Sequence, residues 1–271
     1  MPELKSVRAI GLLCAAIGLS ACSKSAPSAS ELRITAEEYG FRMLDTIPAG
    51  LVHITLHNGG ADIHEAVLVH FTNSILTAAM YADSVRANID FPANAENTGG
   101  AALTKPGDSS GTWLRLAPGH YAVLCWKGDH LTRGMAHDLW VVDSHAAEAP
   151  PPKATRELTL AEFAFTLDKP FTAGTHVLHV RNAGTEDHEG DMYKATPTAG
   201  LRELVAWLEA GEHGLPPIAP AAGFGDIDPG KEVWIEMHLT PGQYFILCRV
   251  PAKSDKKPHS THGMIKEFSI Q

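Results

Sequence analysis

Three side chains that can bind a metal lie close together between residues 119 and 135: Cys125, His130 and Met135. They offer a thiolate, an imidazole and a thioether. Copper accepts soft sulfur ligands beside nitrogen, and its usual trigonal site combines two His and one Cys with a weak axial Met. This segment therefore predicts a copper site that still needs a second histidine.

The same frame occurs again near the end of the chain. Both copies read Pro-Gly-x-Tyr-x-x-Leu-Cys and then His-x-Thr-x-Gly-Met, and the second copy supplies Cys248, His259 and Met264. The spacer between Cys and His has four residues in the first copy and ten in the second, whereas the spacing from His to Met is unchanged. This retained spacing indicates that the His and the Met of each loop act together.

Each copy also has an earlier histidine, about sixty residues before its cysteine. His64 and His188 both stand in the frame Asn-x-Gly-x-x-x-His-Glu. The candidate ligands are therefore two sets of four: His64, Cys125, His130 and Met135, and His188, Cys248, His259 and Met264.

This four-part pattern resembles the cupredoxins, the blue copper family, in which an early His at a strand end joins Cys, His and Met from the last loop. The resemblance implies one copper ion per domain, held by the two sets of residues named above. The sequence departs from the family beside the ligands, with Glu65 and Glu189 after the early His and Trp126 and Arg249 after the Cys. Such neighbours can hydrogen-bond the thiolate and tune the metal.

The elements that would hold these residues are mainly strands. Short runs such as residues 51–57 and 121–125 are rich in β-forming residues and bounded by Gly, Pro or Asn, which is typical of a sandwich. Self-comparison at an offset of about 124 residues indicates a duplicated domain. With the resemblance, this predicts an all-β fold of two tandem cupredoxin-like Greek-key β-sandwiches.

One helix is expected in each repeat, between the early His and the Cys. The segment 198–211 has Leu and Val at helical spacing, and its counterpart near 74–87 is less regular. Met80 and Met192 are expected to lie in the core. Ten other histidines are expected at the surface or in strands without a metal role: His53, His70, His120, His137, His145, His176, His179, His213, His238 and His262.

The N-terminus has the pattern of an export signal. Lys5 and Arg8 precede an apolar run too short to span a bilayer, and Leu-Ser-Ala-Cys22 then resembles a bacterial lipobox, which implies lipidation of Cys22. The alternative is an ordinary secretory signal with an incidental cysteine. The expected organisation is a signal peptide (1–21), a flexible tether (22–30), domain 1 (31–144), a Pro-rich linker (145–155) and domain 2 (156–271).

Composition bounds the remaining possibilities. The 271 residues are 44% hydrophobic and 20% charged, enough for two globular domains that share few contacts across the linker. The formal net charge of -9 argues against a nucleic-acid partner. An exported protein with two mature cysteines also allows a disulfide between Cys125 and Cys248, although each has its own His and Met partners.

Three functions fit the sequence. The first is electron transfer by an exported lipoprotein with two blue copper sites, located on the periplasmic side of the outer membrane in a Gram-negative cell and serving an unidentified redox partner. The others are copper storage or delivery with a copper-handling partner, and a metal-free binding module. Cupredoxin enzymes use additional His-coordinated coppers, but Leu124 and Leu247 precede the two cysteines here, so an oxidase or reductase is not expected.

Overall fold

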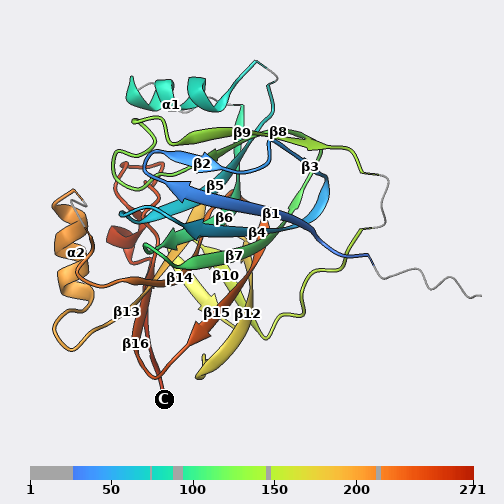
Figure 1. Ribbon diagram of the computed structural model, residues 1–271. Helices are drawn as coiled ribbons and strands as arrows, with labels where there is room; N and C mark the ends of the chain where they lie inside the picture. The colour runs from blue at the N-terminus through green and yellow to red at the C-terminus, as the bar shows by residue number, and fades with distance from the viewer. Residues whose placement is uncertain (1–26, 74, 88–93, 145–147, 212–214) are drawn as a thin grey trace, which may run out of the picture.

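A computed structural model describes residues 27–73, 75–87, 94–144, 148–211 and 215–271, which form two layered β-sheets (Figure 1). The predicted signal peptide, Cys22 and residues 145–147 of the predicted linker lie outside these ranges. Lipidation and the domain boundaries therefore stay predictions.

The first sheet has eight strands, in the order β11-β10-β12-β15-β7-β4-β1-β2. Its strands β4 and β12 alternate buried and less buried residues, as expected for a sheet with one face on the core. The strands are β1 (Ser30–Glu37), β2 (Gly40–Arg42), β4 (Gly50–Asn58), β7 (Ser109–Leu116), β10 (Arg156–Ala161), β11 (Ala164–Leu167), β12 (Gly174–Asn182) and β15 (Glu232–Leu239).

The second sheet has nine strands, in the order β17-β16-β13-β14-β6-β5-β8-β9-β3. Both candidate cysteines directly follow strands of this sheet. Its strands are β3 (Thr46–Pro48), β5 (His64–Phe71), β6 (Ala95–Thr104), β8 (Gly119–Leu124), β9 (Ala136–Val142), β13 (His188–Lys194), β14 (Pro220–Ile227), β16 (Gly242–Leu247) and β17 (Ile265–Ile270).

The main hydrophobic core lies between the sheets and runs through both halves of the chain. It includes Leu68 and Val123 from the first half with Met192 and Ile246 from the second. The predicted fold, two tandem Greek-key sandwiches of the cupredoxin type with one inserted helix each, is confirmed.

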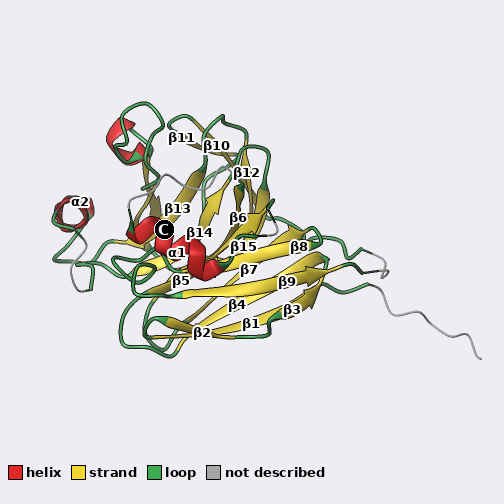
Figure 2. Ribbon diagram, turned by 90° about the horizontal axis from the view of Figure 1, so that it is seen from above, coloured by secondary structure: helices red, strands yellow, loops and turns green. Residues whose placement is uncertain are grey.

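Both predicted helices are present but shorter than expected. They are α1 (Ala78–Arg86) and α2 (Leu201–Glu209), and both lie outside the strand layers (Figure 2). The second helix starts late because Thr196 and Ala199 close a turn before it, with Thr196 N–H donating to Ala199 O at 2.9 Å. Met192 is buried as predicted, whereas Met80 is 44% exposed because α1 buries Ala78, Tyr81 and Ala82 on its other face.

The two halves join edge to edge in both sheets. β7 pairs with β15 and β6 pairs with β14, so each sheet is continuous across the duplication. Trp113 lies opposite Trp234 in the first sheet, and the ring of His53 stacks on Trp113 at 4.0 Å while that of His179 stacks on Trp234 at 4.5 Å. The expectation of few contacts between the halves is therefore wrong.

Close approach at this junction depends on glycine. Gly99 has φ +97, and a Cβ there would lie 2.6 Å from Val233 Cγ1 of the other half. A side chain would both strain the backbone and collide with the neighbouring sheet.

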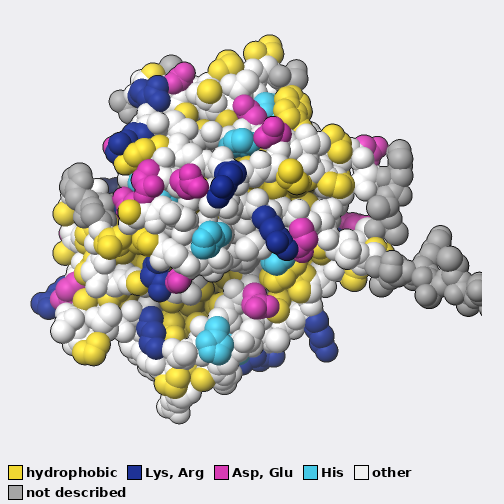
Figure 3. Space-filling model, viewed as in Figure 1, with side chains coloured by type: hydrophobic (Ala, Val, Ile, Leu, Met, Phe, Trp, Pro, Cys, Tyr) yellow, Lys and Arg dark blue, Asp and Glu magenta, His cyan; other side chains and the backbone are white. Residues whose placement is uncertain are grey.

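Within the described residues, no helix is long and apolar enough to cross a membrane. On the face shown in Figure 3, basic and acidic side chains are interspersed. Several histidine side chains are also spread over this face.

Candidate metal centres

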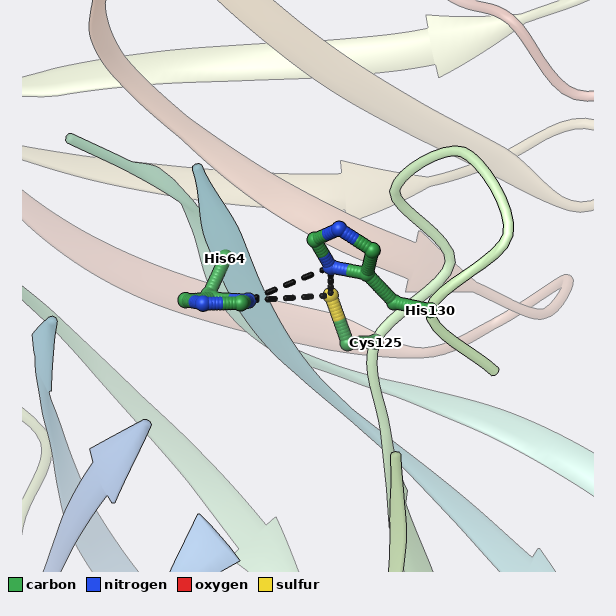
Figure 4. Close-up of side chains that lie close together, drawn as sticks. All are labelled: His64, Cys125 and His130. Carbon is green, nitrogen blue, oxygen red and sulfur yellow. Dashed lines mark hydrogen bonds between the residues drawn. The ribbon is translucent and has the colours of Figure 1, made fainter. Parts of the chain in front are cut away.

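The first centre brings together residues from the start of β5 and from the loop between β8 and β9. His64 is the first residue of β5, Cys125 follows the end of β8, and His130 lies in the loop (Figure 4). His64 Nδ1 lies 3.2 Å from His130 Nδ1, and Cys125 Sγ lies 3.4 Å from His130 Nδ1 and 4.0 Å from His64 Nδ1. These side chains come from residues that are at most 3% exposed.

The second centre repeats this arrangement with His188, Cys248 and His259. His188 Nδ1 lies 3.0 Å from His259 Nδ1, and Cys248 Sγ lies 3.5 Å from His259 Nδ1. All three residues are fully buried, and their donor atoms lie within 4.8 Å of one another. Cys125 and Cys248 are both free, so the disulfide alternative is wrong.

The loop of the second centre has six more residues between Cys and His, yet it closes in the same way. Pro251 bridges to Pro258, and Ala252 N–H donates to Lys257 O at 2.8 Å, so the added residues form a side excursion. His259 then returns to the strand end, where its N–H donates to Val250 O at 2.8 Å. The extra length is absorbed without moving the histidine away from the cysteine.

Met135 and Met264 stand at the same place in the two loops. The Cys125 N–H donates to Met135 O and the Cys248 N–H donates to Met264 O, both at 3.2 Å. Each methionine is fully buried in the main core cluster together with its cysteine. The backbone of each methionine is thus held next to its cysteine, and a role of the two thioethers as axial groups stays a prediction.

The three donors of the first centre fit a metal ion, because they form a triangle with sides of 3.2, 3.4 and 4.0 Å. A triangle with sides of about 3.5 Å has its centre about 2.0 Å from each corner, which is close to metal–nitrogen and metal–thiolate bond lengths. Two imidazoles and one thiolate are the donor set of trigonal copper sites. The residues present therefore fit copper.

Burial sets the protonation of the ligands. It lowers the pKa of His64, with a further effect of the nearby His130, and it lowers the pKa of His188 to about 4, with a further effect of His259. Burial also raises the pKa of both cysteine thiols. His64 and His188 are thus neutral and ready to bind, and metal binding must release a proton from each thiol.

Carboxylates lie at the outer nitrogen of the loop histidines. His130 Nε2 is 3.5 Å from Asp62 Oδ2, and His259 Nε2 is 3.1 Å from Glu186 Oε2. Such partners orient a ligating imidazole and raise its basicity. Neither carboxylate was predicted from the sequence. Each stands two positions before the early His of its repeat, and this shared position is the pattern that could have identified it.

The residues beside the ligands that differ from the cupredoxin pattern form the same contact in both centres. Glu65 Oε1 accepts a hydrogen bond from the Trp126 N–H, and Glu189 Oε1 accepts one from the Arg249 N–H, both at 2.9 Å. Both glutamates are buried. In each centre, the residue after the early His thus holds the backbone amide next to the cysteine.

Aromatic rings also contact the loop histidines. The ring of Tyr39 meets that of His130 edge-on at 5.4 Å between centroids, and the Arg133 guanidinium lies 3.4 Å from the centroid of Tyr39. In the second centre, Phe163 lies 4.9 Å from His259. Each loop histidine is thus packed against an aromatic ring.

Comparison with known proteins finds similarity to this chain among solved structures only. No family model and no curated protein match the chain. A dithionite-reduced auracyanin from the photosynthetic bacterium Roseiflexus castenholzii is similar, with 20% identity over 43% of this chain and 99% of that chain and a TM-score of 0.32.

Two longer structures cover both halves. A multicopper oxidase is 13% identical over 89% of this chain and 88% of that chain, with a TM-score of 0.26. A copper-containing nitrite reductase from Thermus scotoductus is 13% identical over 89% of this chain and 61% of that chain, with a TM-score of 0.25. TM-scores this low add no argument of their own.

The sandwich topology and the repeated ligand geometry therefore define the class. The chain has a cupredoxin-like fold of two repeated halves, with one candidate copper centre in each half. This agrees with the resemblance that the motifs indicated.

Proposed function

We propose that this protein binds one copper ion in each half and transfers single electrons. The observation that carries the proposal is the buried triangle of two His nitrogens and one Cys sulfur, which occurs in both halves with its donor atoms within 4.8 Å of one another. Copper held by this donor set would supply a one-electron couple. His64, Cys125 and His130 would be its ligands in the first half, with Met135 as the axial group.

Burial favours electron transfer over catalysis. A catalytic metal needs an open coordination position for its substrate, whereas the ligand residues here are at most 3% exposed. Among the described residues, only the two centres bring three His, Cys or acidic donors together. The protein matrix also holds the imidazoles by outer carboxylates, which limits their movement when the charge of the metal changes.

The cellular setting belongs to the same proposal. An N-terminal signal followed by lipidation of Cys22 would hold the protein at an extracytoplasmic membrane surface, where its partner would be a redox protein. Storage or delivery of copper remains the alternative, and ready transfer of Cu(I) to a chelator would favour it.

The test is a visible spectrum of the full-length protein after addition of Cu(II). A thiolate bound to Cu(II) should give an intense charge-transfer band that disappears on reduction and returns on oxidation. Copper uptake without such a band would contradict the proposal. A band that cannot be cycled would favour storage over electron transfer.

A further inference from the structure

The cluster beneath helix α2 contains residues of both halves of the chain. The helix belongs to the second half, and its buried Leu204 lies in a hydrophobic cluster with Ile63 and Leu103 of the first half. Ile63 directly precedes the candidate ligand His64. Leu103 directly precedes Thr104, which pairs with His64 between β6 and β5. The packing of this helix thus reaches the strand end that carries a ligand of the other half.

A tryptophan of α2 contacts the loop of the first centre. The Nζ of Lys127 lies over the Trp207 ring, 4.7 Å from its centroid. Lys127 is only 3% exposed, and it lies in the four-residue spacer between Cys125 and His130. A cation is attracted to the face of an indole ring, and the attraction is stronger where water is excluded. The contact therefore ties the loop of the first centre to the second half.

Lys127 in turn holds a candidate ligand. The His130 N–H donates to Lys127 O at 3.1 Å, and His130 Nδ1 is one corner of the first triangle. The Met135 N–H donates to His130 O at 3.0 Å, so backbone hydrogen bonds connect Lys127 through His130 to Met135. A side-chain contact that fixes Lys127 therefore also fixes the backbone from which the His130 ring extends.

The corresponding position in the second loop is apolar. Val250 stands two residues after its cysteine, as Lys127 does, and Val250 O accepts the His259 N–H at 2.8 Å. Val250 is 5% exposed and belongs to the main core cluster. Helix α1, the counterpart of α2, packs in a cluster whose described members all come from the first half. The backbone hydrogen bond is thus repeated, whereas the contact with the helix of the other half is a feature of the first centre.

We propose that Trp207 is a positioning residue for the first candidate copper centre. It holds Lys127, whose backbone carbonyl holds His130, so the second half completes the site of the first half. This inference rests on the proposed copper function. Without the indole ring the loop has more freedom, and ordering it when copper binds should weaken binding at the first centre alone.

The first experiment needs no copper. Amide hydrogen exchange of the metal-free protein, followed by NMR, reports the His130 N–H and the His259 N–H separately. Trp207→Leu should speed exchange of the His130 amide about 5-fold, the change expected from loss of one cation–π contact, and leave the His259 amide unchanged. A general loss of stability would instead speed exchange at His259 as well, since His259 belongs to the half that carries Trp207.

The second experiment measures copper binding at each centre. Cys248→Ser leaves only the first centre with a thiolate, and Cys125→Ser leaves only the second. Competition with a Cu(II) chelator, followed at the thiolate band, should show about 5-fold weaker binding when Trp207→Leu is added to Cys248→Ser and no change when it is added to Cys125→Ser. Leu208→Ala removes another side chain that α2 packs against the same cluster, and this matched control should leave both affinities unchanged.

Two further variants show whether Trp207 acts through Lys127. Trp207→Phe keeps an aromatic face and should retain most of the first-centre affinity. Lys127→Met keeps the length of the side chain without its charge and should weaken binding at the first centre. The double variant with Trp207→Leu should lose no more than the larger of the two single losses, because both changes remove one contact. Lys127→Met also carries the test if Trp207→Leu does not fold.

The outcomes separate this inference from the proposed function. Unchanged exchange of the His130 amide and unchanged first-centre affinity in both Trp207→Leu and Lys127→Met would overturn the positioning role and leave the copper function intact. Equal losses at both centres would also overturn the positioning role, because the effect would then be general. Absence of a thiolate band in both Cys125→Ser and Cys248→Ser would overturn the copper function, and the exchange of the His130 amide would still decide the role of Trp207.

Discussion

His64 Nδ1 and His130 Nδ1 lie 3.2 Å apart, although 66 residues separate them in the sequence. His188 and His259 repeat this relationship at 3.0 Å across 71 residues. Two strand ends of one sheet produce the contact in each half, because the early histidine begins one strand and the cysteine loop leaves its neighbour. The geometry therefore depends on sheet register as much as on the loop.

The first prediction concerns the source of the colour. Cys125→Ser and Cys248→Ser should each remove part of the visible absorption, and the double variant should be colourless while it stays folded, since Ser is close in size but offers no thiolate. Absorption and circular dichroism spectra measure both properties. A band that survives in the double variant would exclude thiolate ligation.

The second prediction concerns the outer carboxylate of the second centre. In a Cys125→Ser background, Glu186→Gln should weaken Cu(I) binding about 10- to 100-fold, because the carboxylate 3.1 Å from His259 Nε2 no longer supports the imidazole. Competition with a chromogenic Cu(I) chelator measures this. Glu236→Gln on the exposed side of β15 is the control, and equal affinities in both variants would show that the carboxylate has no such effect.

The third prediction concerns the junction. Gly99→Ala and Gly107→Ala both place a side chain at positive φ, but only the Gly99 substitution meets the other half, since nothing lies within 4 Å at Gly107. Gly99→Ala should therefore cost about 1 to 3 kcal/mol more in free energy of unfolding. Denaturant titration of both variants measures the difference. Equal losses would indicate that the junction is loose.

The fourth prediction concerns acid stability of the metal-free protein. The folded pKa of His188 is about 4 against an ordinary value of 6.5, so its contribution is complete above pH 6.5 and is lost as the pH falls toward 4. The loss from this group should be about 3 kcal/mol. Urea titration at pH 7 and pH 4.5 measures it. His188→Gln should show a smaller loss over this range, and an unchanged loss would assign the effect to other groups.

The fifth prediction concerns anchoring. Cys22→Ser should move the protein from the membrane fraction to the soluble exported fraction, because the attachment point for lipid is removed. Cell fractionation with immunodetection measures this, and Ser23→Ala provides a neighbouring control. Identical membrane fractions for Cys22→Ser and the unaltered protein would contradict the lipoprotein assignment.

Local sequence patterns alone were enough to identify the candidate His and Cys ligands and to show that the secondary structure is mainly β-strand. The repeated loop and the repeated Asn-x-Gly-x-x-x-His-Glu frame identified the six His and Cys residues that the structure gathers into two triangles. Alternation of apolar residues identified strands such as Gly50–Asn58, since one face of that strand lies on the core. Both signals lie within short segments, which is why they could be read without the fold.

Tertiary structure alone decided how the halves meet. The pairing of β6 with β14 and of β7 with β15 leaves no periodic signal in either strand, because any exposed edge can form these backbone hydrogen bonds. The Pro-rich linker suggested separate domains, whereas the sheets run through. The same edge pairing places Ala101 of the first half opposite Phe224 of the second, a relationship that depends on which edges are joined and in which register.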